Sequence, residues 1–373
     1  MHSLQPSTRK PAQTATAIVY CEANFGKIDG KTANGLIRRS ERYQIIGVID
    51  SEKAGEDSGS VLDGKANGIP IFQDFEDGLA KMQSTPDYFI FGVAPATGML
   101  SQNERNLILK AIGLGMNIVN GLHEFLNDDP QFVEASKKMK VNLIDIRKPP
   151  SKKDLRLYSG RITEIDCVRI AVLGTDCAIG KRTTANILND ALNEAGLKSV
   201  MIGTGQTGLI QGARYGVALD AVPSQFCAGE LEATIIEAFE NEKPDVIIIE
   251  GQGSLSHPAF STSSFILRGS SPQGVILQHA PKRVHRCDFE QLPMPLPTTE
   301  INLIQTFSNT KVIGLTINHE NMTDLEVDDA IVSFESELSI PVTDAMSRSP
   351  DHLVKMVTTG FPKLAKKTQG PAL

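Results

Sequence analysis

A chain of 373 residues is longer than one hydrophobic core usually serves, so its length favours two domains. Apolar residues make up 40% and charged residues 22% of the chain, which is ordinary for a folded globular protein and excludes a disordered or fibrous one. The formal net charge of −7 gives no electrostatic reason for a nucleic-acid surface, so we expect no nucleic-acid partner.

The five cysteines are far apart and have no CxxC spacing, which favours neither a disulfide framework nor a structural zinc site. We therefore expect no metal centre and a reducing compartment. Residues 1–16 are polar and lack the apolar segment of a secretory signal. The longest apolar runs fall well short of the roughly 18 residues that a membrane span needs. These features predict a cytoplasmic protein that makes no membrane contact.

From residue 16 the chain alternates β-branched apolar runs with amphipathic stretches, which is the pattern of parallel β-α-β units. This predicts a Rossmann-like parallel sheet over residues 15–150. The loop after the first strand lacks the G-x-G-x-x-G fingerprint, so Asp50 is interpreted as a turn residue rather than a ribose ligand. The expected strands are 17–20, 45–50, 69–72, 88–93 and 116–119, with helices at 31–40 and 104–114.

Residues 147–159 are basic, contain paired prolines and interrupt this alternation, which predicts a linker and a domain boundary near 150–165. The alternation then restarts. A second α/β domain, with a P-loop NTPase-like parallel sheet, is predicted over residues 165–362. Its expected strands are 168–173, 199–202, 246–249, 274–277 and 312–317, with a helix at 181–195.

The strongest functional signal is a glycine-rich loop between the first strand and the helix of the second domain, with the pattern G-x5-G-K-x-T. Glycines let backbone amides turn around an anion, the helix start adds its dipole, and Lys181 adds a positive charge. Arg182 stands where P-loops usually carry the hydroxyl that binds Mg²⁺, so phosphate binding is favoured over Mg-nucleotide chemistry. The expected cofactor-binding residues are Gly174, Thr175, Asp176, Cys177, Ala178, Ile179, Gly180, Lys181, Arg182, Thr183 and Thr184.

Further polar groups follow the other strands. Glu250 ends an apolar strand, as the second acidic motif of P-loop proteins does, and could act as a base or have a structural role. His257 and His279 follow strands at the same sheet edge, and each has the same two alternatives. Cys177 has no histidine near it in sequence, which favours a small packing residue over a nucleophile. The expected catalytic residues are Glu250, His257 and His279, and the expected substrate-binding residues are Gly205, Gln206, Thr207, Arg214, Gln252, Lys282 and Arg283.

Five stretches of the second half resemble the D-glutamate N-acetyltransferase family, in which a Rossmann-like half precedes a P-loop-type half. They are GTDCAIGKRTTA from Gly174, GTGQTGLIQGARYGVALDA from Gly203, SQFCAGELE from Ser224, IIIEGQGSLSHP from Ile247 and GVILQHAPKR from Gly274.

The resemblance implies acetyl transfer from acetyl-CoA to the amino group of D-glutamate. The phosphates of CoA would lie in the glycine-rich loop, and Arg214 and Arg283 would hold the carboxylates of this acidic D-amino acid. The loop and Glu250 are more distantly similar to dethiobiotin synthetase, which implies the alternative of an ATP- and Mg²⁺-dependent kinase or ligase. A nucleotide-binding sensor is a third alternative. We also expect a homodimer or higher homo-oligomer, because α/β edges often pair.

Overall fold

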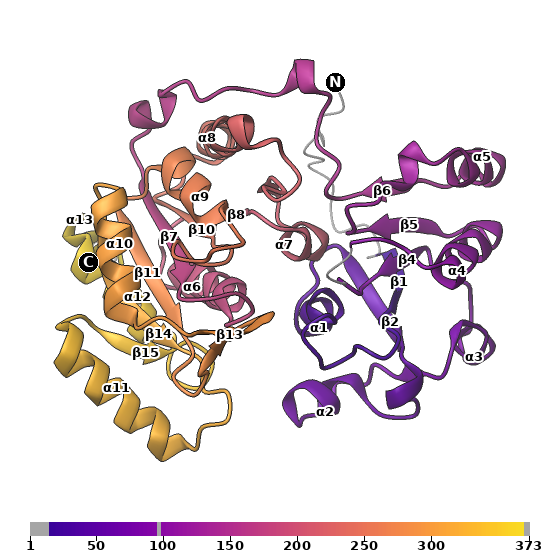
Figure 1. Ribbon diagram of the computed structural model, residues 1–373, viewed down its shortest axis with the longest axis horizontal. Coiled ribbons are helices and arrows are strands. Elements are labelled where there is room, and N and C mark those ends of the chain that lie inside the picture. The colour runs from indigo at the N-terminus through magenta and orange to yellow at the C-terminus, as the bar shows by residue number, and fades with distance from the viewer. Residues whose placement is uncertain (1–14, 95–97, 369–373) are drawn as a thin grey trace, which may run out of the picture. The chain divides into compact units, whose positions relative to one another are not determined.

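The computed structural model describes residues 15–94 and 98–368 (Figure 1). Residues 1–14, which carry most of the polar segment used to argue against a secretory signal, lie outside this part. The chain forms two compact units, which we describe separately. One extends to Lys148 and includes Ile210–Gly212, and the other comprises the remaining residues from Pro149 onward. In the described part of the chain, the helices lack the length and apolar character needed to cross a membrane.

The N-terminal unit contains a six-stranded sheet in the order β3-β2-β1-β4-β5-β6, and every pair in it is parallel. This is the strand order of a Rossmann fold, as the sequence predicts. Its elements are β1 (Ala15–Tyr20), α1 (Lys31–Arg38), β2 (Tyr43–Ile49), α2 (Ser58–Asp63), β3 (Ile71–Phe72), α3 (Phe75–Lys81), β4 (Tyr88–Phe91), α4 (Gln102–Gly113), β5 (Asn117–Asn120), α5 (Pro130–Met139) and β6 (Leu143–Asp145).

Asp50, at the end of β2, has the turn role that its sequence context predicts. Its buried carboxylate accepts hydrogen bonds from the backbone N–H of Asn24 at 3.1 Å and of Phe25 at 2.8 Å. It also accepts from the N–H of Glu52 at 2.9 Å, which caps a short 3-10 turn. The carboxylate therefore fixes the loop that follows β1.

The second unit contains a seven-stranded sheet in the order β15-β14-β11-β7-β10-β8-β9, again with parallel pairs. A two-stranded antiparallel ribbon of β12 and β13 accompanies it. Its elements are β7 (Val168–Gly174), α6 (Lys181–Glu194), β8 (Ser199–Gly203), α7 (Gln206–Gln211), β9 (Tyr215–Gly216), α8 (Ser224–Glu242), β10 (Val246–Glu250), α9 (Thr262–Ser270), β11 (Gly274–His279), β12 (His285–Arg286), β13 (Phe289–Pro293), α10 (Pro297–Phe307), β14 (Lys311–Ile317), α11 (Asp324–Leu338), β15 (Val342–Asp344), α12 (Asp351–Gly360) and α13 (Pro362–Thr368).

The central strand β7 is buried on both faces. Ile170 and Val172 pack in a core with residues of α6 and α12, while Ala171 and Leu173 pack in a second core with residues of α8 and α9. This division follows from the alternation of side chains along a strand. Because β7 lies between β10 and β11, the carboxyl ends of these three strands meet at one edge of the sheet, where ligands of open α/β sheets bind.

The second unit begins within the predicted linker, at the first of the paired prolines. Helix α8 binds a later part of this linker. Arg156 forms an ion pair with Glu230 at 2.7 Å. The backbone N–H of Ser159 donates to Glu232 at 2.6 Å. Both glutamates are buried in α8, and a buried carboxylate requires such partners. The segment around residues 156–159 is therefore packed on the second unit.

Candidate functional site

The glycine-rich loop runs from the end of β7 to the start of α6, as the sequence predicts. Two residues in it adopt left-handed backbone angles, Ala178 with φ of 49° and Gly180 with φ of 101°. Gly174 leaves no room for a side chain, because a Cβ there would come within 2.7 Å of Ile179 Cδ1. The N–H of Thr175 donates to the carbonyl of Gln278 on β11 at 3.0 Å. The loop is thus tightly folded and attached to the neighbouring strand.

Lys181 is the first residue of α6 and its side chain is buried. The ammonium group donates to the carbonyl of Asp176 within the loop. Burial lowers the pKa of this lysine, opposed by the negative charge of nearby acidic groups. The first turn of α6 reads Lys-Arg-Thr-Thr and carries no acid, so its N–H groups and two positive charges favour an anion.

Glu250 is buried at the end of β10, beside the loop that follows β8. Its Oε2 accepts from the N–H of Thr204 at 3.0 Å, and its carbonyl accepts from the hydroxyl of Thr204 at 2.9 Å. Burial raises the pKa of Glu250, against the opposing effect of the charges on Arg182 and Lys181. Gln252 donates from Nε2 to the hydroxyl of Thr204 at 3.3 Å. The structure therefore brings Glu250, Gln252 and the start of the loop after β8 together.

The other predicted residues of that loop lie at the start of α7. A Cβ on Gly205 would come within 2.3 Å of Gln252 Nε2, so the two residues are in close contact. Gln206 and Thr207 are buried in the first turn of α7. This group lies at the carboxyl ends of β8 and β10, on the same sheet edge as the glycine-rich loop.

His279, at the end of β11, binds the glycine-rich loop. Its Nδ1 lies 2.9 Å from the hydroxyl of Thr175, and its ring packs edge-on against Phe334. Burial lowers the pKa of His279 to about 4, so the ring is neutral near pH 7. This geometry gives His279 a positioning role for the loop and does not support its use as a base.

His257 reaches the same loop from the segment after β10. Its Nε2 lies 3.7 Å from Oδ1 of Asp176, and both side chains are fully buried. Within the described residues these two atoms lack a hydrogen-bond partner. The N–H of Ala259 donates to Nδ1 at 3.2 Å, which leaves the proton of a neutral ring on Nε2. Burial, followed by the charge of Arg286, lowers the pKa of His257.

Cys177 completes a group with Asp176 and His257. One Asp176 oxygen, Cys177 Sγ and one His257 ring nitrogen all lie within 4.8 Å of one another. The sequence argument against a nucleophile was the absence of a nearby histidine, and the fold supplies one. These atom types can also bind a transition metal. Metal binding would require the Nε2 lone pair, however, and the Ala259 N–H instead favours a proton at that position.

Arg283 holds the loop from outside. It donates to the carbonyl of Cys177 at 3.0 Å and to that of Ala178 at 3.2 Å. It also forms an ion pair with Glu320 at 2.7 Å, and its side chain lies 3.8 Å from Asp176. The geometry therefore does not favour the predicted role of Arg283 as a carboxylate ligand, because its N–H groups already donate to other residues of the protein.

Two predicted substrate ligands are not brought to this group. Arg214 forms an ion pair with Glu242 at the end of α8 and packs on the ring of Tyr215. Lys282 is exposed and pairs with Glu326 on α11 at 2.6 Å. Each cation is neutralised by a helix carboxylate that the sequence pattern did not connect to it.

Arg286 is a buried cation on β12. It donates to the hydroxyls of Ser254 at 3.0 Å and Ser256 at 2.8 Å. Among the described residues it has no ion pair with an acidic side chain. It also donates to the backbone carbonyls of Thr175 at 3.4 Å and Ser256 at 3.5 Å, so its positive charge, and not a free donor, would favour an anionic group of a ligand nearby.

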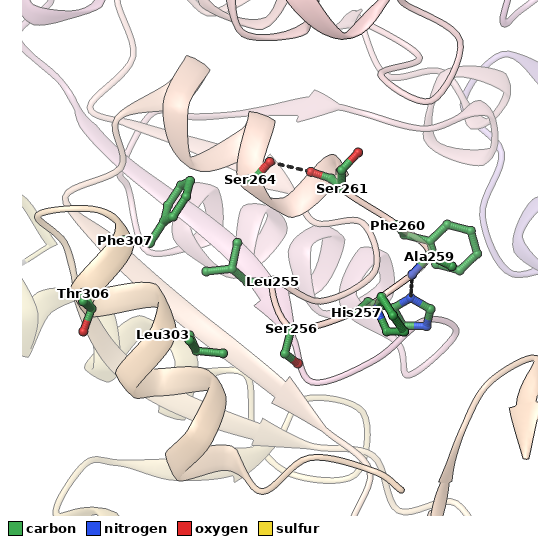
Figure 2. A pocket seen from close by; sticks show the side chains of 11 residues that line it. Leu255, Ser256, His257, Ala259, Phe260, Ser261, Ser264, Leu303, Thr306 and Phe307 are labelled. Atoms are coloured by element: carbon green, nitrogen blue, oxygen red, sulfur yellow. Dashed lines mark hydrogen bonds between the residues drawn. The ribbon is translucent and has the colours of Figure 1, made fainter. Parts of the chain in front are cut away.

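Beside His257 lies a pocket of about 570 Å³. Figure 2 shows His257, Ala259 and Phe260 grouped on one side of it and the α10 residues on the other. Its lining is mostly apolar, and the ring of His257 stacks on Phe260 with centroids 4.6 Å apart. The lining consists of Leu255, Ser256, His257, Pro258, Ala259, Phe260, Ser261, Ser264, Leu303, Thr306 and Phe307.

Known proteins share this architecture. A family model described as the P-loop domain DUF1611_C, a domain of unknown function, matches residues 156–354. A model described as the Rossmann-like domain DUF1611_N matches residues 51–149. The chain belongs to the DUF1611 family. A solved structure of a DUF1611 protein from Anabaena variabilis is similar to it with a TM-score of 0.85 and 29% identity, covering 92% of this chain and 99% of that one.

Two relatives of this DUF1611 chain carry a functional name. A Pseudoalteromonas protein named D-glutamate N-acetyltransferase is 33% identical over 273 residues, which is 71% of this chain and 80% of the relative. A Tritonibacter scottomollicae protein of the same name is 29% identical over 272 residues, covering 71% and 79%. These relatives support an enzyme of the transferase class.

Sequence reasoning gave too little weight to part of the DUF1611 site. Arg286 is missing from the expected site residues, because nothing local in the sequence shows that it is buried beside two serines. Asp176 was assigned to the loop without a role for its carboxylate. The α10 residues of the pocket belong to no motif. The available signal was the Ser-x-Ser-His run of Ser254 to His257, which directly follows the strand of Glu250.

Proposed function

We propose that this chain transfers an acetyl group from acetyl-CoA to the amino group of D-glutamate. The observation that carries the proposal is the 33% identity, over 71% of the chain, to the Pseudoalteromonas protein named D-glutamate N-acetyltransferase. The glycine-rich loop, Glu250 and His257 meet at one edge of the sheet, and all three lie within the stretches that resemble the D-glutamate N-acetyltransferase family.

The glycine-rich loop is suited to the phosphates of CoA. Lys181 and Arg182 supply positive charge at the start of α6, where backbone N–H groups also favour an anion. Binding of the CoA phosphates does not require a metal ion. The sequence agrees with this, because Arg182 stands where P-loops usually carry the hydroxyl that binds Mg²⁺.

Glu250 is the best candidate for the base. An amino group is mostly protonated near pH 7, so attack on a thioester requires a group that removes a proton. Burial raises the pKa of Glu250 and so makes its carboxylate more basic. His257 and His279 fit the role less well, because Nδ1 of each ring is engaged and burial lowers the pKa of both.

Arg286 supports the choice of an acidic acceptor. Its buried guanidinium contacts serine hydroxyls and adds a positive charge that favours a substrate carboxylate nearby. Because Ser256 and His257 both line the pocket, a carboxylate beside Arg286 would lie near the pocket and the glycine-rich loop. D-glutamate has two carboxylates, and this positive charge would favour one of them there.

The test is a thiol-release assay with acetyl-CoA and D-glutamate, L-glutamate or D-aspartate, with ATP and Mg²⁺ omitted. We expect CoA release with D-glutamate and little with the other two. Absence of CoA release with all three, together with Mg²⁺-dependent ATP turnover, would overturn the proposal in favour of a kinase or ligase. ATP binding without turnover would instead indicate a nucleotide sensor.

A further inference from the structure

Cys177 lies in the glycine-rich loop near His257, which lines the pocket. Its sulfur is within 4.8 Å of an Asp176 oxygen and of a His257 ring nitrogen. A Cβ built on Gly253 would lie 3.3 Å from the Cβ of Phe260 and 3.8 Å from the sulfur of Cys177. Cys177 is partly exposed, whereas Cys21, Cys167, Cys227 and Cys287 are buried. Cys177 thus combines partial exposure of the residue with two polar groups nearby.

Those two groups are a further, independent observation. Oδ1 of Asp176 and Nε2 of His257 are buried, and among the described residues neither has a hydrogen-bond partner. Leaving a buried polar atom without a partner costs about 1–3 kcal/mol, so such atoms indicate a function or a bound group. An Asp176 oxygen and a His257 ring nitrogen lie within 4.8 Å of the Cys177 sulfur, where an acceptor and a donor of protons would be needed.

We propose that Cys177 is a nucleophile that carries the acetyl group as a thioester during the reaction. This inference rests on the proposed function. Asp176 accepts the proton of the thiol. Nδ1 of His257 accepts from the N–H of Ala259, so Nε2 carries the proton of the ring. This N–H stabilises negative charge on the sulfur or on the thioester oxygen. Arg283 donates to the carbonyl of Cys177 at 3.0 Å and so fixes the backbone that carries the sulfur.

The first half-reaction transfers the acetyl group to the enzyme. It requires the flexible pantetheine arm of acetyl-CoA to fold back, so that the thioester reaches the loop that holds the phosphates. The thiol proton of Cys177 moves to Asp176, and the sulfur electron pair forms a bond to the acetyl carbon. The carbon–sulfur bond of acetyl-CoA breaks, and its electron pair remains on the CoA sulfur. That sulfur takes the proton from Asp176, so CoA leaves as a thiol and the enzyme holds one acetyl thioester.

The second half-reaction transfers the acetyl group to the acceptor. The substrate ammonium first gives one proton to Glu250. Its nitrogen then bonds to the acetyl carbon while the bond to Cys177 breaks and returns its electron pair to the sulfur. The second proton of the nitrogen passes through Asp176 to Cys177. The proton on Glu250 is released to water, and the enzyme returns to its starting state.

The experiment exposes the whole protein to acetyl-CoA without an acceptor, stops the reaction with acid, and identifies acetylated peptides by mass spectrometry. We expect one acetyl group on Cys177 that neutral hydroxylamine removes, because hydroxylamine cleaves thioesters but not the amides formed on lysines. Cys177→Ala should lose this label and at least about 10³-fold of the acetyl-transfer rate. Cys167→Ala, at a buried cysteine outside the group, should keep both.

Kinetics and metal analysis complete the test. Initial rates against both substrates should give parallel double-reciprocal lines, which indicate release of CoA before the acceptor reacts. Three results together would overturn this inference and leave the proposed function standing. They are CoA release with D-glutamate but no label on Cys177, intersecting double-reciprocal lines, and a Cys177→Ser variant that keeps the wild-type rate. One equivalent of zinc that Cys177→Ser loses would overturn it in favour of a metal site.

The labelling step also separates the two proposals. If no acceptor yields CoA release, the proposed function fails, but acetyl-CoA alone can still label Cys177. A hydroxylamine-sensitive label would then support the nucleophile with another acceptor, and its absence would overturn the nucleophile as well.

Discussion

The carboxylate of Glu250 occupies the space beside Gly208: a Cβ built on that glycine would come within 2.6 Å of Glu250 Oε2. Both residues are part of the packed edge where β10 meets α7. Glu250 is buried and its Oε2 accepts a hydrogen bond from the N–H of Thr204. A side chain on Gly208 must therefore displace the carboxylate or the helix.

Gly208→Ala should lower the free energy of unfolding of the second unit by about 1–3 kcal/mol, the usual cost of overpacking. It should also lower the acetyl-transfer rate, because Glu250 is moved. Urea unfolding and the thiol-release assay measure these effects. The control is Gly113→Ala at the end of α4, where a Cβ meets no atom within 4 Å of the described structure and where alanine is the better helix former. Equal stability of the two variants would contradict the expectation.

Glu250→Gln should remove the base without removing its volume. We expect the acetyl-transfer rate to fall by about 10²–10⁴-fold, the range of a lost acid–base group. Burial raises the pKa of Glu250 because it penalises the charged form, so the neutral amide should unfold no more easily than the wild type. A variant that keeps the wild-type rate would exclude Glu250 as the base.

Lys181→Met should weaken binding of the CoA phosphates while preserving the volume of the buried side chain. Loss of a charge-assisted hydrogen bond costs about 1.5–3 kcal/mol, so KM for acetyl-CoA should rise by about 10- to 100-fold. KM for D-glutamate should change little. Lys355→Met, at an exposed lysine on α12, is the matched control and should behave as the wild type. A comparable rise in KM for both substrates would argue against a phosphate-specific role.

Local signals predicted much of this fold from the sequence. The parallel sheets follow from alternating apolar runs, and the P-loop follows from glycines placed between a strand and a helix. Strand ends were less well placed. Residues 69–72 were expected as a strand, whereas β3 contains only Ile71 and Phe72, and Pro70 makes an isolated antiparallel bridge to Asp57. Proline lacks the N–H that a ladder requires.

The site could be predicted only where its residues follow neighbouring strand ends. Glu250 and Lys181 meet that condition, since their strands are adjacent in the sheet. The pairing of Cys177 with His257 could not be read from spacing, because the loop after β10 folds back over the P-loop. Arg214 was misplaced for a similar reason. Its partner Glu242 lies at the far end of α8, and only the packing of that helix brings them together.

The stability of the protein should depend on pH through His279. Its pKa falls from the ordinary value of 6.5 to about 4 because the ring is buried, so the folded protein binds this proton less readily than the unfolded chain. The contribution of His279 is therefore unchanged above about pH 6.5 and becomes increasingly destabilising as pH falls toward 4. At about pH 5 the cost is roughly 2 kcal/mol relative to about pH 8. Urea unfolding of the wild type and of His279→Asn at both pH values isolates the contribution of His279 to the free energy of unfolding, since other groups contribute equally to the two proteins. The wild type should lose about 2 kcal/mol more than the variant, and identical pH profiles would show that His279 ionises freely in the folded state.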